Sequence, residues 1–125
     1  MYSLGITMLA AVVILGPATS RASAQDLSAE GQRQFRARCG GCHAVEAGKT
    51  GIGPNLAGVL GRRAGSASGA RYSQALANAT ITWDAATLDQ FLTNPKALVP
   101  GTLMAISVKD ANIRAALISY LATVH

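Results

Sequence analysis

The chain has few charges, few aromatic residues and only two cysteines. Of its 125 residues, 14% are charged and 5% are aromatic, whereas 50% are hydrophobic, a composition that excludes a disordered chain. No apolar run reaches the roughly 20 residues of a membrane-spanning helix. No stretch alternates long enough to predict a β-strand. The sequence thus predicts one small helical domain, a size that often gains stability from a metal, a disulfide or a cofactor.

Residues 1–24 are expected to be a cleaved signal peptide, followed by the domain of residues 25–125. Residues 4–15 form an apolar run, and the small residues that follow end in Ala22-Ser23-Ala24, which fits a cleavage site before Gln25. The start of the chain contains no Lys or Arg, unlike most export signals. The alternatives are a buried helix or an uncleaved tether.

The predicted mature chain is modestly basic. Cleavage would remove Arg21 and no acidic residue, so the formal net charge falls from +5 to +4. The basic residues are scattered and form no dense run, which does not favour nucleic acid as a partner. They suit partner proteins with acidic docking surfaces, although a solvated face without a dedicated partner explains them equally well.

The two ends of this domain are predicted to be helices that cross. Ser28 can cap a helix that runs to Arg38, in which Gly31 and Phe35 lie on one side, a bare spot next to an aromatic ring. Asp110 can cap the last helix, which carries an apolar stripe at helical spacing: Ile113, Ala116, Leu117, Tyr120, Leu121 and Val124. We expect this stripe to pack on the Gly31/Phe35 face.

The middle of the chain predicts two short helices and a long loop. Asp84 can cap a helix that Asn94-Pro95 ends, because the residue before a proline avoids the helical region. A shorter helix is expected over residues 73–79. Residues 48–69 contain seven glycines and are expected to be mainly loop.

The strongest motif is Cys39-Gly40-Gly41-Cys42-His43, the C-x-x-C-H pattern of covalent haem c attachment. Two thiols add to the haem vinyl groups, and the histidine that follows lies under the iron as a ligand. A disulfide or thioredoxin-like pair is an alternative, but the strand-helix-strand setting that accompanies it is absent. A zinc site would need four ligands, and the candidates are Cys39, Cys42, His43 and His125.

Met104 is the candidate for the second axial iron ligand. A thioether suits a haem iron that transfers electrons, because it favours the reduced ion. Met104 is the only methionine after residue 24, and it follows the turn-rich Pro100-Gly101 outside any predicted helix. If a methionine binds the iron in the mature chain, it is this one.

An ordered series of motifs gives the chain a resemblance to a known family. The series is Cys39-Gly-Gly-Cys42-His43, Gly53-Pro54-Asn55-Leu56-x-Gly58, Gly61-Arg62, Tyr72-Ser73, Trp83-Asp84, Leu92-x-Asn94-Pro95 and Pro100-Gly101-Thr102-x-Met104. It runs through the whole predicted mature chain in the same order as in the mitochondrial-type class I cytochromes c, which the chain resembles.

The resemblance implies an all-α class I cytochrome c fold, with about four short helices and long loops wrapped around one covalently bound haem. It also implies roles for individual residues. The Pro54 carbonyl would accept the outer N–H of the ligand histidine and orient it. Arg62, Tyr72 and Trp83 would hydrogen-bond or neutralise the buried haem propionate, and Thr102 would lie near the outer one.

The chain departs from the family pattern at two positions near the expected iron site. Phe91 replaces a tyrosine whose hydroxyl bonds the methionine sulfur in the family, so this hydrogen bond cannot form. Leu76 stands where the family often has asparagine. Both changes bear on how firmly Met104 is held.

The resemblance implies an electron-transfer protein rather than an enzyme. We expect a monomeric carrier, exported into a bacterial periplasm, that exchanges one electron with an oxidase, reductase or dehydrogenase. One alternative is a haem enzyme or ligand-binding sensor in which Met104 is easily displaced. Another is a dedicated cytochrome subunit of a dehydrogenase.

Overall fold

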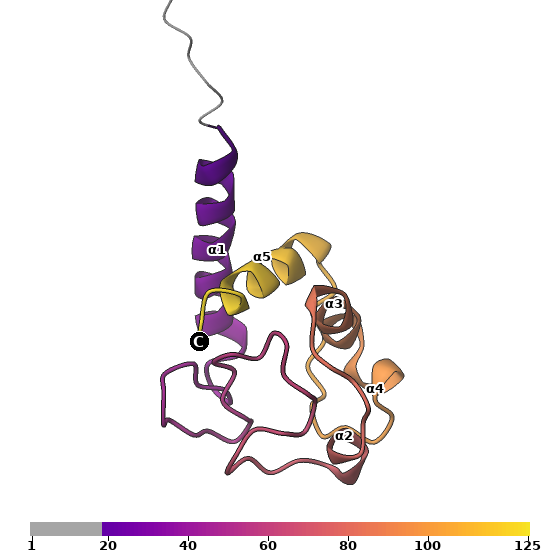
Figure 1. Cartoon of the computed structure of the whole chain (residues 1–125). Coiled ribbons are helices and arrows are strands. Elements are labelled where there is room, and N and C mark those ends of the chain that lie inside the picture. Colours follow the sequence, from indigo (N-terminus) through magenta and orange to yellow (C-terminus); the bar gives the residue numbers. More distant parts are fainter. Residues whose placement is uncertain (1–18) are drawn as a thin grey trace, which may run out of the picture.

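The structure, a computed structural model, describes residues 19–125 as helices joined by long loops (Figure 1). These residues contain no strand, and one isolated bridge pairs Arg63 with Thr82. In chain order the helices are α1 (Thr19–Arg38), α2 (Gln74–Ala77), α3 (Ala85–Thr93), α4 (Pro95–Leu98) and α5 (Ala111–Leu121). The predicted all-helical fold is therefore confirmed, and α4 is the one helix that the sequence did not indicate.

Helix α1 begins earlier than the sequence predicts. It starts at Thr19, so Ser28 lies inside the helix, and the prediction that Ser28 caps it is wrong. The residues just before Ser28 include alanine and glutamine, which favour helix, so the helix extends upstream. It runs through the predicted cleavage position after Ala24, whereas the apolar run of residues 4–15 lies outside the described residues. From residue 19 onward, no helix combines the length and apolar character needed to cross a membrane.

The predicted crossing of the terminal helices is confirmed. Figure 1 shows α5, in yellow, crossing the lower half of α1. A Cβ atom added to Gly31 would lie only 2.7 Å from the Cβ of Tyr120 and would also overlap the Ala116 carbonyl. The Phe35 and Tyr120 rings pack beside this point with their centroids 5.6 Å apart. A glycine at this position thus lets the two backbones meet.

Helices α3 and α4 follow each other directly, and polar caps set their ends. Asp84 accepts a hydrogen bond from the Thr87 N–H (2.7 Å), while the Thr87 hydroxyl accepts one from the Asp84 N–H (2.9 Å). This reciprocal cap confirms the predicted start of α3. Asn94 ends α3 and caps α4, and Pro95 begins α4 with its side chain buried in the core.

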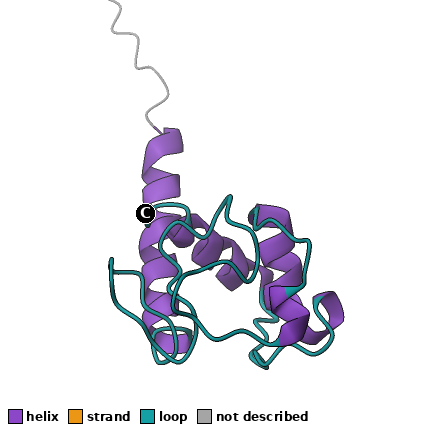
Figure 2. Cartoon of the chain, turned by 60° about the horizontal axis from the view of Figure 1, so that its bottom comes forward, coloured by secondary structure: helices purple, strands orange, loops and turns teal. Residues whose placement is uncertain are grey.

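The cap of α5 is also as predicted, and the chain end ties the long loop to the helices. Asp110 accepts hydrogen bonds from the first N–H groups of α5. The helix ends at Leu121, and the Val124 carbonyl beyond it accepts a hydrogen bond from the Gly58 N–H (2.8 Å). Figure 2 shows how loops occupy the space between the helices.

Candidate functional site

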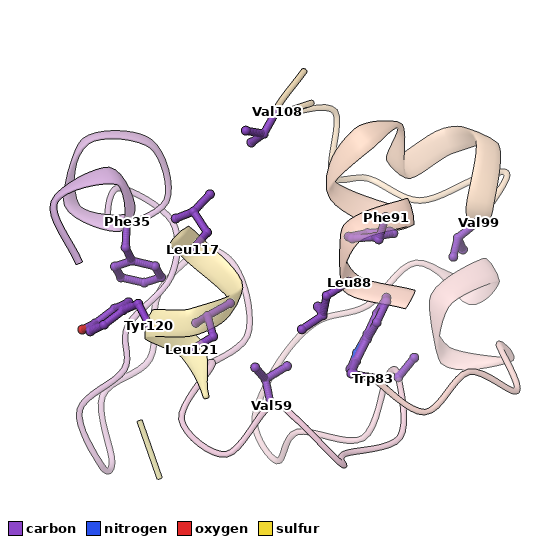
Figure 3. Packing of buried hydrophobic residues seen from close by; sticks show 11 residues of the cluster. Phe35, Val59, Trp83, Leu88, Phe91, Val99, Val108, Leu117, Tyr120 and Leu121 are labelled. Atoms are coloured by element: carbon purple, nitrogen blue, oxygen red, sulfur yellow. The ribbon is translucent and has the colours of Figure 1, made fainter. Parts of the chain in front are cut away.

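A pocket lies between two groups of core side chains. Figure 3 shows Phe35, Leu117, Tyr120 and Leu121 of α1 and α5 on one side, and Trp83, Leu88 and Phe91 of α3 and the residues before it on the other. The pocket is lined by side chains of both groups, and its empty volume, including the part open to solvent, is about 760 Å³. Among the predicted site residues, it brings together Cys39, His43, Pro54, Arg62, Tyr72, Trp83 and Met104.

The C-x-x-C-H motif continues the path of α1 in a tight turn. The N–H groups of Cys42 and His43 both donate to the Cys39 carbonyl, at 3.0 and 2.9 Å. Cys39 lines the pocket, whereas Cys42 does not, and both thiols are free and half-buried. Burial raises the pKa of the Cys39 thiol, and the positive charge of Arg38 opposes that rise. Cys39 therefore lies at the pocket, and the two thiols are not joined as a disulfide.

His43 is held in one orientation by its neighbours. Its Nδ1 lies 2.7 Å from the Pro54 carbonyl oxygen, so Nδ1 carries the proton and donates it. A Cβ atom at Gly53 would lie 2.8 Å from Nδ1 and overlap the ring, so the glycine lets the backbone run along the imidazole. The other ring nitrogen, Nε2, makes no hydrogen bond within residues 19–125 and is the one left to bind a metal.

Asn55, which follows Pro54, holds this loop together, a role that the sequence did not predict. Its side-chain amide donates to the carbonyls of Glu46 and Lys49, both at 2.8 Å, and its Oδ1 accepts from the Ala57 N–H at 2.8 Å. The only sequence clue was its place in the Gly53-Pro54-Asn55 motif. Asn55 therefore fixes the backbone that presents the Pro54 carbonyl to the histidine.

Met104 reaches the same pocket from a loop near the other end of the chain. Its N–H lies 3.3 Å from the hydroxyl oxygen of Thr102, which accepts the hydrogen bond. Thr102 is buried, but it does not line the pocket. Its proposed contact with a haem propionate stays a prediction. Leu76 and Phe91, the two departures from the family pattern, both line the pocket.

Arg62, Tyr72 and Trp83 line the pocket and carry polar groups. The Arg62 guanidinium donates to the carbonyls of Asn55 (2.8 Å) and Ala57 (3.1 Å), which leaves further N–H groups free. The Tyr72 hydroxyl oxygen accepts from the Ala67 N–H (3.0 Å), so its own proton remains available to donate. Trp83 stacks at a tilt on Phe91. Arg62 and Tyr72 can therefore supply hydrogen-bond donors of the kind that a carboxylate needs.

The residues present fit a haem. The pocket is lined mainly by apolar side chains, as a porphyrin requires, and Arg62 and Tyr72 of its lining carry N–H and O–H groups. It offers an imidazole whose tautomer is already fixed, a thioether and the thiol of Cys39, and the second thiol of the motif, Cys42, follows three residues later in the chain. Over residues 19–125, no three His, Cys, Asp or Glu side chains gather closely enough to hold a metal ion without such a group.

Comparison with known proteins also points to a haem protein. The sequence model of the cytochrome c family matches residues 28–125. Cytochrome c2 of Rhodomicrobium vannielii is 46% identical over 98 residues, which cover 77% of this chain and 78% of the relative. Cytochrome c2 iso-2 of Magnetospirillum fulvum is 46% identical over 84 residues, or 66% and 88% of the two chains. Cytochrome c of Euglena viridis is 43% identical over 94 residues, or 74% and 92%.

The relatives thus include bacterial and eukaryotic proteins, and the family match begins after the predicted signal peptide and reaches the last residue. The match confirms the resemblance on which the expected fold, cofactor and role depended. The chain belongs to the cytochrome c family and is accordingly a carrier of electrons through covalently bound haem c rather than an enzyme.

Proposed function

We propose that this chain holds one haem c through Cys39 and Cys42, with His43 and Met104 as the axial ligands of the iron. The observation that carries the proposal is that His43, fixed by the Pro54 carbonyl, and Met104 line the same apolar pocket. An imidazole and a thioether are a ligand pair that raises the potential of a haem and suits electron transfer. When bound, haem supplies an iron that changes its charge by one electron.

Residues of this chain would orient the iron ligand, attach the haem, exclude water and bind the propionates. The hydrogen bond to Pro54 fixes the tautomer of His43 and makes Nε2 a stronger ligand. Each thiol of the motif can add across a vinyl group, with its sulfur forming the new bond to carbon and its proton going to the neighbouring carbon. Apolar residues such as Leu88 and Leu117 exclude water from the pocket. Arg62 and Tyr72 offer N–H and O–H donors to the propionates.

We place this carrier outside the cytoplasm, most simply in a bacterial periplasm, after removal of residues 1–24. Cleavage before Gln25 would remove no described part of the core, because residues 24–27 are exposed and the first buried position among residues 24–38 is Gly31. The contact of Gly31 with α5 would remain. The net charge of +4 then favours redox partners with acidic docking surfaces, as a carrier requires partners that give and take electrons.

The test starts from exported wild-type protein and two variants, Met104→Ala and, as a matched control, Leu103→Ala. Leu103 is the adjacent residue and is 81% exposed, so the loss of its side chain should change little. Mass spectrometry should show the chain from Gln25 with one haem attached in all three proteins. Met104→Ala should lose the far-red absorption of a thioether-bound ferric haem. It should also bind carbon monoxide at least about tenfold more tightly when reduced.

Two results would contradict this proposal. A purified chain without covalent haem would remove the role given to Cys39 and Cys42. Equal carbon monoxide binding by wild type and Met104→Ala would mean that Met104 does not close the iron, and the protein would then be better described as a ligand-binding haem protein. Equal binding by wild type and Leu103→Ala is expected in either case.

A further inference from the structure

The segment that carries Met104 is anchored at its start and free in its middle. The Thr102 N–H donates to the Val99 carbonyl (3.0 Å), and the Thr102 hydroxyl accepts from the Met104 N–H (3.3 Å). The other residues between Thr102 and Val108, which are Leu103 and residues 105–107, make no hydrogen bond within the described part of the chain. The position of Met104 therefore depends on where the segment is next fixed.

The next fixed point is the pair Val108 and Lys109, which lies against the C-terminal end of α3. The Val108 N–H donates to the Leu92 carbonyl (2.7 Å), and the Lys109 ammonium donates to the Thr93 carbonyl (3.0 Å). The last carbonyls of a helix have no partner within the helix, so these donors satisfy groups that α3 leaves free. The ammonium also lies at the negative end of the helix dipole.

A side chain of α5 holds the other side of the same two residues. The buried Arg114 guanidinium donates through one nitrogen to the carbonyls of Val108 (3.0 Å) and Lys109 (2.8 Å). Its Nε donates to the Asp89 carboxylate of α3 at 2.7 Å. Val108 and Lys109 are thus hydrogen-bonded to α3 on one side and to α5 on the other. A planar guanidinium can make these three bonds at once, whereas an ammonium matches the geometry poorly.

Building on the proposed role of Met104 as an iron ligand, we propose that Arg114 is the positioning residue for Met104. Arg114 does not line the pocket. It acts through the backbone, by fixing the far anchor of a segment in which, among the described residues, Leu103 and residues 105–107 make no hydrogen bond. A short tethered loop has few conformations in which its methionine leaves the pocket. Loss of the anchor lengthens the free loop and adds such conformations.

The test measures the binding of imidazole to the oxidised holoprotein, because imidazole binds the iron only when Met104 leaves it. Arg114→Gln should raise the affinity for imidazole roughly tenfold, the effect of losing about one charge-assisted hydrogen bond. Arg114→Lys should fall between this variant and wild type. Arg33→Gln is the control, because it removes an exposed pair between Arg33 and Glu30 on α1, remote from this loop in the chain.

Amide hydrogen exchange gives a readout that does not depend on imidazole. The Val108 N–H, bonded to Leu92, should exchange roughly tenfold faster in Arg114→Gln, while the His43 N–H, bonded to Cys39, should keep its wild-type rate. A purely structural role for Arg114 would instead lower the free energy of unfolding and leave imidazole binding unchanged. That result overturns the proposal.

A second variant covers the case in which Arg114→Gln fails to fold. Asp89→Asn keeps the bonds of Arg114 to the two carbonyls and removes only the charge of the carboxylate that orients it. We expect a smaller rise in imidazole affinity, about twofold to threefold, and an unchanged affinity would overturn the proposal. If wild type and Met104→Ala have the same spectrum, the assignment of Met104 as ligand fails first, and the role of Arg114 fails with it.

Discussion

The two loops that carry the proposed iron ligands are built differently. The His43 ring is hydrogen-bonded to the Pro54 carbonyl, and the backbone of Gly53 packs directly against the ring. The Asn55 side chain hydrogen-bonds three backbone groups of the same loop. Around Met104, the hydrogen bonds within residues 19–125 lie at Thr102, which bonds Val99 and the Met104 N–H, and at Val108. One side is fixed locally, residue by residue. The other depends on distant anchors in α3 and α5.

This difference suits the chemistry of the two ligands. A histidine must present one nitrogen in one tautomer, which local hydrogen bonds achieve. A thioether has no proton to place, so packing and loop length decide whether it stays at the iron. We therefore expect changes near His43 to affect whether the site forms at all, and changes near Met104 to affect how often it opens.

The largest effect is expected from a methyl group at Gly53. In Gly53→Ala the new Cβ would overlap the His43 ring, so the ring or the backbone must move and the hydrogen bond to Pro54 is strained. Overpacking of this kind costs about 1 to 3 kcal/mol or more. We expect a several-fold lower yield of holoprotein and a lower free energy of unfolding, measured by haem absorbance per unit protein and by denaturant titration.

Gly41→Ala is the matched control, because it adds the same methyl group between the two cysteines. A Cβ atom at Gly41 meets nothing within 4 Å, and its backbone does not require glycine. Haem yield and unfolding should match those of wild type. If the two variants behave alike, His43 is not held by close contact with Gly53, and the contrast between the two loops loses its basis.

The sequence predicts the rigid parts of this molecule better than the anchored loop. The caps at Asp84 and Asp110 and the glycine crossing at Gly31 are local signals, and the structure confirms them. The start of α1 was missed because helix-forming residues before Ser28 outweigh a good capping residue. The hydrogen bond from Arg114 to the Val108 carbonyl could not be predicted, because a single arginine beside an apolar stripe gives no indication of its partners.

A smaller effect is expected from restoring the hydroxyl that Phe91 lacks. Phe91 lines the pocket together with Met104, and its ring packs on Trp83 with centroids 5.0 Å apart. Phe91→Tyr adds one group that can donate to the methionine sulfur, worth about 1 kcal/mol. Imidazole affinity of the oxidised protein should fall by up to about fivefold, while haem yield stays unchanged. A higher imidazole affinity would mean that the added hydroxyl disturbs the packing instead of securing Met104.

The smallest effect is expected from lowering the pH. Acid should destabilise α3 and the Met104 loop that depends on it before it affects the loop around His43. Hydrogen bonds from the Thr87 N–H and hydroxyl lower the pKa of Asp84, the cap of α3. The stabilisation from the Asp84 carboxylate is therefore complete above the ordinary aspartate pKa of about 4 and is lost as the pH falls through the lowered value. In that range the start of α3 should fray, as measured by faster exchange of the Thr87 N–H relative to the His43 N–H.

Asp84→Asn separates this cause from general acid unfolding. An asparagine amide oxygen can still accept from the Thr87 N–H but does not titrate, so the extra acid sensitivity of α3 should disappear in the variant. Any acid change in Met104 binding that persists in Asp84→Asn must then come from another group. Helix α3 carries both Phe91, which lines the pocket with Met104, and the Leu92 carbonyl that bonds Val108, so fraying of α3 loosens the Met104 loop in two ways. Within residues 19–125, the hydrogen bond that orients His43 goes to Pro54 and does not involve this helix.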